Sequence, residues 1–195
     1  MSQDPDWEAL FERQMQKRRF VAELLLTSEL HWEAARPDTL MHFLEQYTLH
    51  DSYWIGVWID PLEEEAILAF EWDTFWAQGR VPDPTDQVIS WPTLLIRLNK
   101  LVMYYYDKQD QFKDGSTYIG AAETQTITLE EREQLLTCFS GNLQLASSGT
   151  EFLFSEDLVH TTISGDMGRW HFLHNSQVDL LCLGEDGQPI PIPGV

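Results

Sequence analysis

The spacing of the apolar residues changes near residue 50, and this change limits the folds that are open to the chain. Between Asp6 and Leu25 the apolar residues recur at helical intervals, and charged residues occupy the other side. From Tyr53 to Asp60 they occupy alternating positions on both faces, which is typical of a β-strand with two largely apolar faces. Helical periodicity followed by strand periodicity predicts an α+β fold.

Turn and capping residues divide the chain into further elements. Arg36-Pro37-Asp38 is expected to open a second helix that contains Leu40 and Tyr47. Thr128, with a glutamate three residues later, forms a capping box and predicts one further short helix near 128–139. Strands are expected at Tyr53–Asp60, Glu65–Asp73, Leu94–Leu98, Val102–Tyr106, Phe152–Phe154, Leu158–Ile163, Arg169–His174 and Val178–Leu183. We therefore expect N-terminal helices packed on a mainly antiparallel sheet.

The length of 195 residues is that of one domain, and we predict a single domain over 1–195. Its tail, about 184–195, contains three prolines and is expected to be flexible. Cys138 and Cys182 lie among apolar neighbours without CxxC spacing, which favours buried thiols over a disulfide or a catalytic cysteine.

The charge balance argues against two classes of partner. The chain has 32 acidic and 12 basic residues, so its formal net charge is −20. Because nucleic acids and anionic membranes both attract clustered Lys and Arg, we expect neither as a partner. The first residues do not form a signal peptide, and no apolar run is long enough to span a bilayer, so a cytoplasmic location is expected.

Half of this net charge lies in one region that is also rich in tryptophan. Residues 37–90 contain 11 acidic residues and 1 basic residue, and five of the eight tryptophans lie between 54 and 91. Trp54 and Trp58 are predicted to share one face of their strand. The tryptophans either fill the core or form an exposed patch that binds a basic protein. The candidate partner-binding residues are Trp54, Trp58, Glu63, Glu64, Glu65, Glu71, Trp72, Asp73 and Trp76.

Two histidines are the candidates for a metal or ligand site. If Gly165 to Gly168 forms a hairpin turn, paired residue numbers sum to about 333, and His160 lies opposite Leu173. His171 is then a diagonal neighbour of His160 on the same face, whereas His174 faces the other side. Without an HExxH or paired CxxC motif, two ordinary polar strand residues are the favoured interpretation, and we expect no metal and no cofactor.

No residue is assigned a catalytic role. His50-Asp51-Ser52 contains the residue types of a hydrolase triad, but adjacent residues at a strand start point in different directions. We expect Asp51 and Ser52 to bond nearby backbone amides instead. Glu71 and Asp73, two residues apart, are predicted to share a strand face, where mutual repulsion would raise one pKa.

The stretch Leu49-His50-Asp51-Ser52-Tyr53-Trp54 resembles a segment of small bacterial α+β proteins of the immunity type, in which an L-H-D-S-like stretch leads into a hairpin. The resemblance extends over Leu49 to Asp73 and implies a non-enzymatic intracellular protein that blocks a toxin or another partner by binding. We therefore expect an interaction module for a basic protein. Two alternatives stay open: an enzyme or small-ligand binder with a pocket near the histidine-bearing strands, and a homo-oligomer that buries the tryptophans between copies.

Overall fold

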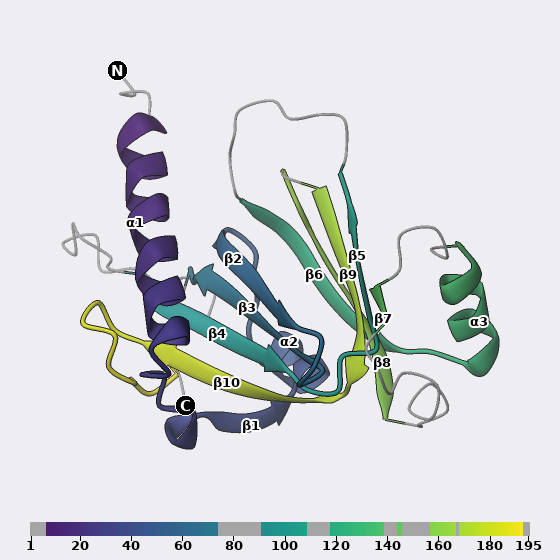
Figure 1. Cartoon of the computed structure of the whole chain (residues 1–195). Helices are drawn as coiled ribbons and strands as arrows, with labels where there is room; N and C mark the ends of the chain where they lie inside the picture. The colour runs from purple at the N-terminus through teal and green to yellow at the C-terminus, as the bar shows by residue number, and fades with distance from the viewer. Residues whose placement is uncertain are drawn as a thin grey trace.

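Two antiparallel sheets and three helices make up the part of the chain that the computed structural model describes, namely residues 7–73, 91–108, 118–138, 144–145, 157–166 and 168–192 (Figure 1). The α+β fold is thereby confirmed. The first sheet has the order β1 (Arg36–Thr39), β10 (Gln177–Leu183), β4 (Thr93–Leu98), β3 (Glu65–Glu71) and β2 (Tyr53–Asp60). The second has the order β6 (Ile119–Thr126), β8 (Leu158–Gly165), β9 (Gly168–Asn175), β5 (Met103–Asp107) and β7 (Gln144–Leu145). The helices are α1 (Trp7–Leu26), α2 (Leu40–Gln46) and α3 (Leu129–Cys138), with a short 3-10 turn η1 (Trp32–Ala34).

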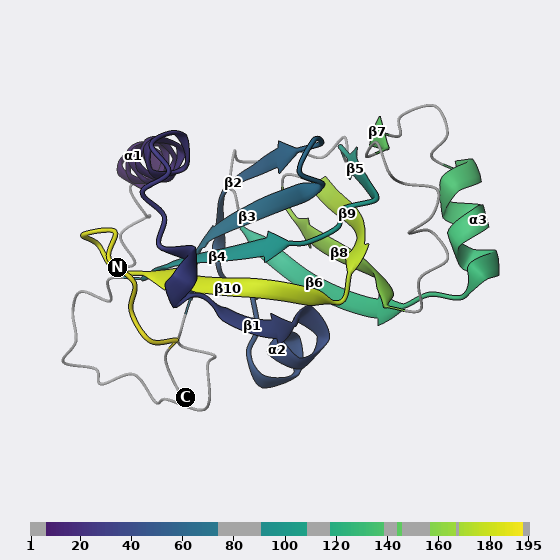
Figure 2. The same ribbon diagram turned by 60° about the horizontal axis from the view of Figure 1, so that its bottom comes forward.

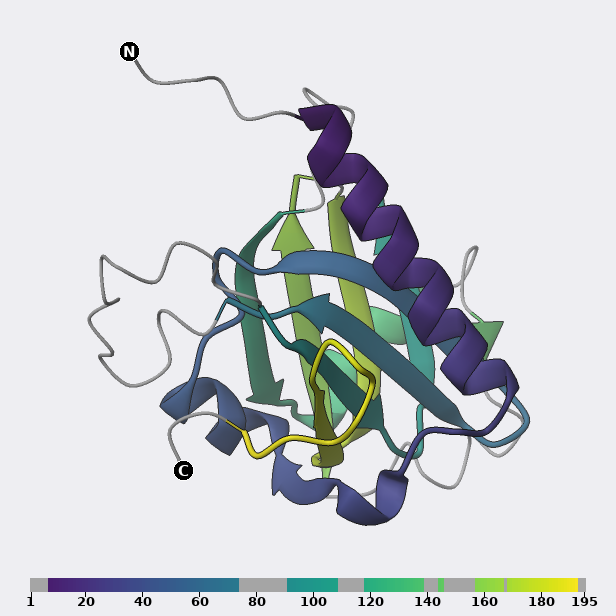
Figure 3. The ribbon, with the colours of Figure 1, turned by 90° about the vertical axis from the view of Figure 1, so that its left-hand side faces the viewer.

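The two sheets face each other; α1 crosses the outer side of the first sheet (Figure 3), and α3 lies at the outer side of the second sheet (Figure 1), where Leu135 packs on it. The largest core lies between the two sheets and contains Phe70, Ile96 and Phe172. Helix α2 closes one end of that core and contributes Phe43 (Figure 2). Val21 of α1 covers the outer face of the first sheet. None of the described helices combines the length and the apolar content that a membrane span requires.

The chain passes from one sheet to the other at two corners, between β4 and β5 and between β9 and β10. Backbone hydrogen bonds join the two corners, since the amide of Asn175 donates to the carbonyl of Asn99 (3.1 Å) and that of Val102 to Leu173 (2.8 Å). The edge strands β2 and β6 also meet, because the Ile119 amide donates to the carbonyl of Ser52 (2.9 Å). These links hold the two sheets in one fixed arrangement.

Several predicted elements are confirmed, and one helix start is corrected. The Thr128 capping box caps α3 as expected: the Glu131 amide donates to Thr128 Oγ1 (3.2 Å), and the Thr128 amide donates to Glu131 Oε2 (2.8 Å). Arg36 to Thr39, however, forms the edge strand β1 rather than the first turn of α2. Proline is accepted there because an edge strand leaves some amides without a ladder partner. Thr39 is the residue that caps α2, since its Oγ1 accepts from the His42 amide.

A β-bulge overturns the prediction that Trp54 and Trp58 share a face. The register between β2 and β3 shifts between Trp54 and Gly56, so the alternation of side chains is reversed after the bulge. Trp54 faces the core between the sheets, whereas Trp58 packs on the α1 side of the first sheet, against the apolar cluster that contains Val21. The position of the bulge was not evident from the residue pattern.

The segment from Gly184 to Ile192, which we expected to be flexible, folds back on the first sheet. The Ile190 amide donates to the carbonyl of Cys182 (2.9 Å), and the side chain of Ile192 is buried. Cys182 is a buried thiol, as predicted, and burial raises its pKa to about 12. The predicted strand Phe152–Phe154 and residues 193–195 lie outside the described residues, and so does the side chain of Cys138.

Candidate functional site

Two of the candidate tryptophans belong to the core rather than to a partner-binding surface. Trp72 has no exposed surface; it packs against Phe43 and Tyr47, and its indole Nε1 donates to the carbonyl of Thr48 (3.0 Å). Trp54 is buried against Phe70. The apolar area of each ring is therefore already removed from water, and neither ring is accessible to a partner.

Glu71 and Asp73 are also buried, which corrects their assignment to an exposed partner-binding patch. The side chain of Glu71 is only 3% exposed, and its Oε1 accepts a hydrogen bond from Lys17 Nζ (2.9 Å) with Arg13 at 3.3 Å. A buried carboxylate needs such partners, so this cluster holds α1 on the first sheet. The Lys17 side chain is thus part of the packing of α1 on the first sheet.

The remaining accessible candidates lie at the end of the β2–β3 hairpin, residues 60–65, which we name the acidic hairpin end. Leu62 is 83% exposed at its tip. The turn has a fixed shape, because Asp60 Oδ1 accepts from the amides of Leu62 (2.9 Å) and Glu63 (3.2 Å). The Leu101 amide also donates to the carbonyl of Glu64 (2.6 Å), which ties the turn to the corner between β4 and β5. Of the two remaining candidates, Trp58 of β2 is half-buried, and Trp76 lies outside the described residues.

The acidic hairpin end concentrates like charges. Asp60 and Glu65 are directly opposed across the two strands, an arrangement that destabilises a sheet. Partial burial raises the pKa of Glu65; Arg97 lowers it, and Glu63, Asp179 and Asp60 raise it. Arg97 is itself occupied, since its guanidinium binds Asp179 (2.8 Å) and lies over the Trp32 ring. Like charges therefore face each other at this turn, and the nearby Arg97 guanidinium is shared with Asp179.

The histidine register predicted from the glycine turn is confirmed. Gly165 pairs with Gly168 and His160 with Leu173, and His160 Nε2 lies 3.1 Å from His171 Nδ1 on the outer face of the second sheet. Burial lowers the pKa of His160, and burial followed by the neighbouring His160 lowers the pKa of His171 to about 4. Both imidazoles are neutral at pH 7. Among the described residues, no three His, Cys, Asp or Glu side chains converge on a metal position.

His174 faces the other side of the strand, as predicted, and is completely buried. Its Nδ1 lies 2.6 Å from the carbonyl of Asn175, which can only accept, so Nδ1 carries the hydrogen. Nε2 then accepts from the hydroxyl of Thr161 (2.8 Å). Both ring nitrogens are satisfied in the neutral form, and burial lowers the pKa of His174 to about 4. His174 is a structural residue of the core.

His50, Asp51 and Ser52 do not form a triad. Ser52 Oγ accepts from the backbone amide of Asp73 (3.0 Å), which fits the expected backbone role, although the partner is 21 residues away. Asp51 instead binds side chains: its carboxylate accepts from His50 Nδ1 (2.6 Å) and from the Tyr118 hydroxyl. Burial, followed by this bond to Asp51, raises the pKa of Tyr118. Ser52 is completely buried and its hydroxyl oxygen binds the Asp73 amide, which does not fit the accessible nucleophile of a triad.

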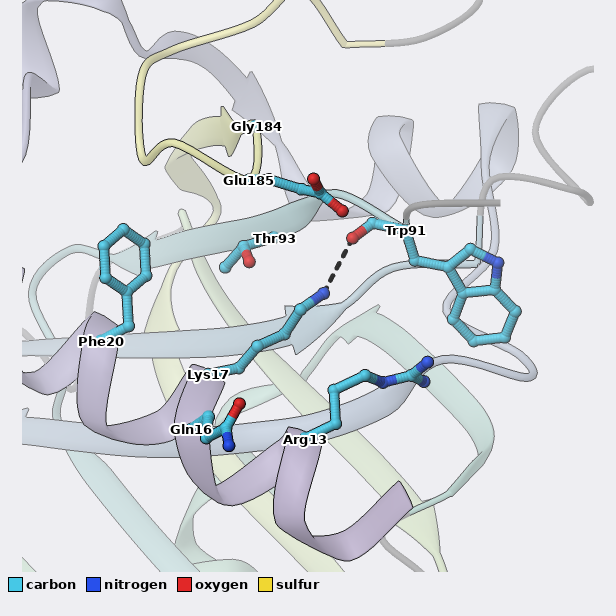
Figure 4. A pocket seen from close by; sticks show the side chains of 8 residues that line it. All are labelled: Arg13, Gln16, Lys17, Phe20, Trp91, Thr93, Gly184 and Glu185. Atoms are coloured by element: carbon cyan, nitrogen blue, oxygen red, sulfur yellow. Dashed lines mark hydrogen bonds between the residues drawn. The ribbon is translucent and has the colours of Figure 1, made fainter. Parts of the chain in front are cut away.

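A cleft of about 300 Å³ lies between α1 and the first sheet (Figure 4). Lys17 reaches across it and donates to the carbonyl of Trp91 (2.9 Å), as the dashed line shows. The same ammonium also binds Glu71, so the cation in this cleft serves to hold α1 in place. The lining residues are Arg13, Gln16, Lys17, Phe20, Trp91, Thr93, Gly184 and Glu185.

Comparison with known proteins identifies no relative: no family model matches the chain, and neither a curated protein nor a solved structure is significantly similar to it.

Proposed function

We propose that the protein is a non-enzymatic interaction module that binds a basic protein through the acidic hairpin end. The observation that carries this proposal is the highly exposed Leu62 within a turn of fixed shape that also presents four carboxylates. Exposed apolar side chains that are surrounded by charged groups are common at the centres of protein interfaces.

The electrostatics of the turn support a cationic partner. Asp60 and Glu65 repel each other across the strands, and a lysine or arginine placed between them would relieve that repulsion. The net charge of −20 would add long-range attraction, so association should be fast at low salt and slower at high salt. An interaction role is also what the immunity-type resemblance of Leu49 to Asp73 implies.

The α3 helix offers an instructive contrast, because it also combines an exposed leucine, Leu129, with glutamates. There the carboxylates lie in the first turn of a helix, where backbone amides and the helix dipole stabilise negative charge. Glu131 in addition closes the capping box. The α3 glutamates are thus stabilised by the helix itself, whereas Asp60 and Glu65 face each other across two strands.

Affinity capture from an extract of the producing cells tests the proposal with two charge-matched variants. Glu63→Lys changes the hairpin end, and Glu45→Lys changes an exposed residue near the C-terminus of α2, where lysine is well tolerated. Each substitution changes the net charge from −20 to −18. We expect basic proteins that bind the wild type and the Glu45 variant but not the Glu63 variant. Equal recovery by all three proteins would contradict the proposal.

A further inference from the structure

The outer face of the second sheet contains a pair of histidines that nothing in the proposed interaction role uses. His160 and His171 come from the neighbouring strands β8 and β9 and lie diagonally on one face. Their rings are 13° from parallel, and the ring centroids are 5.3 Å apart. Because His160 Nε2 and His171 Nδ1 are only 3.1 Å apart, the two rings meet at these nitrogen atoms. Strand pairing fixes the two backbone positions, and the pair is preorganised.

We propose that His160 Nε2 and His171 Nδ1 together chelate one divalent transition-metal ion of the copper-to-zinc end of the series. Imidazole nitrogen is a preferred ligand of these ions. At metal–nitrogen bond lengths of about 2.0–2.1 Å, two nitrogens at right-angle to tetrahedral geometry lie about 2.9–3.4 Å apart. The observed separation falls within this interval. In the metal-free arrangement the two nitrogens face each other, so both rings would have to turn about their Cβ–Cγ bonds to direct their lone pairs at one ion.

The protonation state of the pair favours metal binding. Two facing nitrogens at this distance share one hydrogen in the metal-free protein. A neutral imidazole can carry its hydrogen on either nitrogen, so exchange with solvent exposes both lone pairs without a net loss of protons. Since burial already disfavours imidazolium at both positions, protons compete weakly for the site near pH 7.

Polar groups lie on the same face of the sheet beside the pair, although His160 itself is only 9% exposed. Across the ladder, Gln125 lies opposite His160 and Glu123 opposite Thr162, and both are exposed. Thr162 Oγ1 is 3.5 Å from His160 Nε2. An ion held by the two nitrogens would take its remaining ligands from these polar neighbours or from solvent.

Titration of the whole protein with CuCl₂, followed by calorimetry and electron paramagnetic resonance, tests this proposal. We expect one Cu²⁺ per chain, with the hyperfine pattern of two imidazole nitrogens. His160→Ala and His171→Ala should each weaken binding by at least roughly tenfold, because even changes outside the ligand shell cost about 10–100-fold. His42→Ala is the matched control, since His42 is exposed and paired with Asp38 rather than with another histidine.

The spectrum of the wild-type protein keeps the proposal testable should a variant fail to fold. A wild-type signal from one imidazole or none would overturn it, as would unchanged affinity in folded His160 and His171 variants. Loss of binding in the His42 variant alone would also overturn it. None of these outcomes bears on the acidic hairpin end, which lies on the other sheet.

Discussion

Burial of neutral His174 predicts that acid destabilises the protein over a defined pH range. The pKa of His174 is about 4 in the folded state, compared with an ordinary value of 6.5 in the unfolded chain. Between these values the unfolded state binds more protons than the folded state, so stability falls as the pH drops from 6.5 towards 4. The stabilisation is fully present above pH 6.5. Below about pH 4 both states are protonated, and no further loss arises from this group.

The size of the effect follows from the same two pKa values. At pH 5 the unfolded imidazole is almost fully charged and the folded one is mostly neutral, which corresponds to about 2 kcal/mol lost between pH 7 and pH 5. The cause is structural: protonation would put a hydrogen on Nε2, which accepts from Thr161 within the buried core.

Urea unfolding of the wild type and of His174→Gln at pH 7, 6 and 5 measures this contribution. Glutamine retains a donor and an acceptor but does not titrate, so the variant should lose about 2 kcal/mol less stability across this range. His160, His171 and the carboxylates are common to both proteins, and their contributions cancel in the comparison. Equal pH dependence of the two proteins would refute the assignment of a neutral buried His174.

Three further predictions concern particular contacts. Lys17→Met should lower the free energy of unfolding by about 2–4 kcal/mol in chemical denaturation, because buried Glu71 loses its closest cation. The double variant Lys17→Met/Glu71→Leu should recover part of that loss. Asp60→Asn keeps the side-chain oxygen that accepts from the Leu62 amide and removes the charge repulsion with Glu65 on the opposite strand. Thermal unfolding should show a stabilisation of about 0.2–1 kcal/mol at low salt and a smaller one at high salt. Gly165→Ala should destabilise by about 1–3 kcal/mol, since its Cβ would collide with the carbonyl oxygen of Tyr118. Unchanged denaturation would contradict the close packing of β8 on the start of β6.

Local signals in the sequence predicted the parts of the fold that depend on neighbouring residues. The two glycines at Gly165 and Gly168 fixed the turn, and the period of two then placed His160 and His171 on one face and His174 on the other. The Thr128 capping box marked the start of α3, since it also depends only on residues that are close together in the sequence. Strand β6 was missed because its residues are mostly exposed and polar, without the β-branched or aromatic run that indicates a strand.

The candidate site was harder to predict because it depends on contacts between distant residues. Glu71 looks like a surface carboxylate until Lys17, 54 positions earlier, is placed beside it. The bulge after Trp54 reversed the faces of β2, which sent one tryptophan to the core and the other towards α1. Among the candidates that the structure describes, Glu63 is exposed in the tight turn of the hairpin end, and Glu64 and Glu65 are half-buried beside it.

The most direct test of the account is a ¹H–¹⁵N NMR titration of the full chain with a lysine-rich peptide at low salt. If the acidic hairpin end is the binding surface, amide shifts should centre on Leu62 and Glu63, decline as salt is added, and disappear in Glu63→Lys but not in Glu45→Lys. Shifts centred on the first turn of α3, or spread evenly over all acidic surfaces, would contradict it.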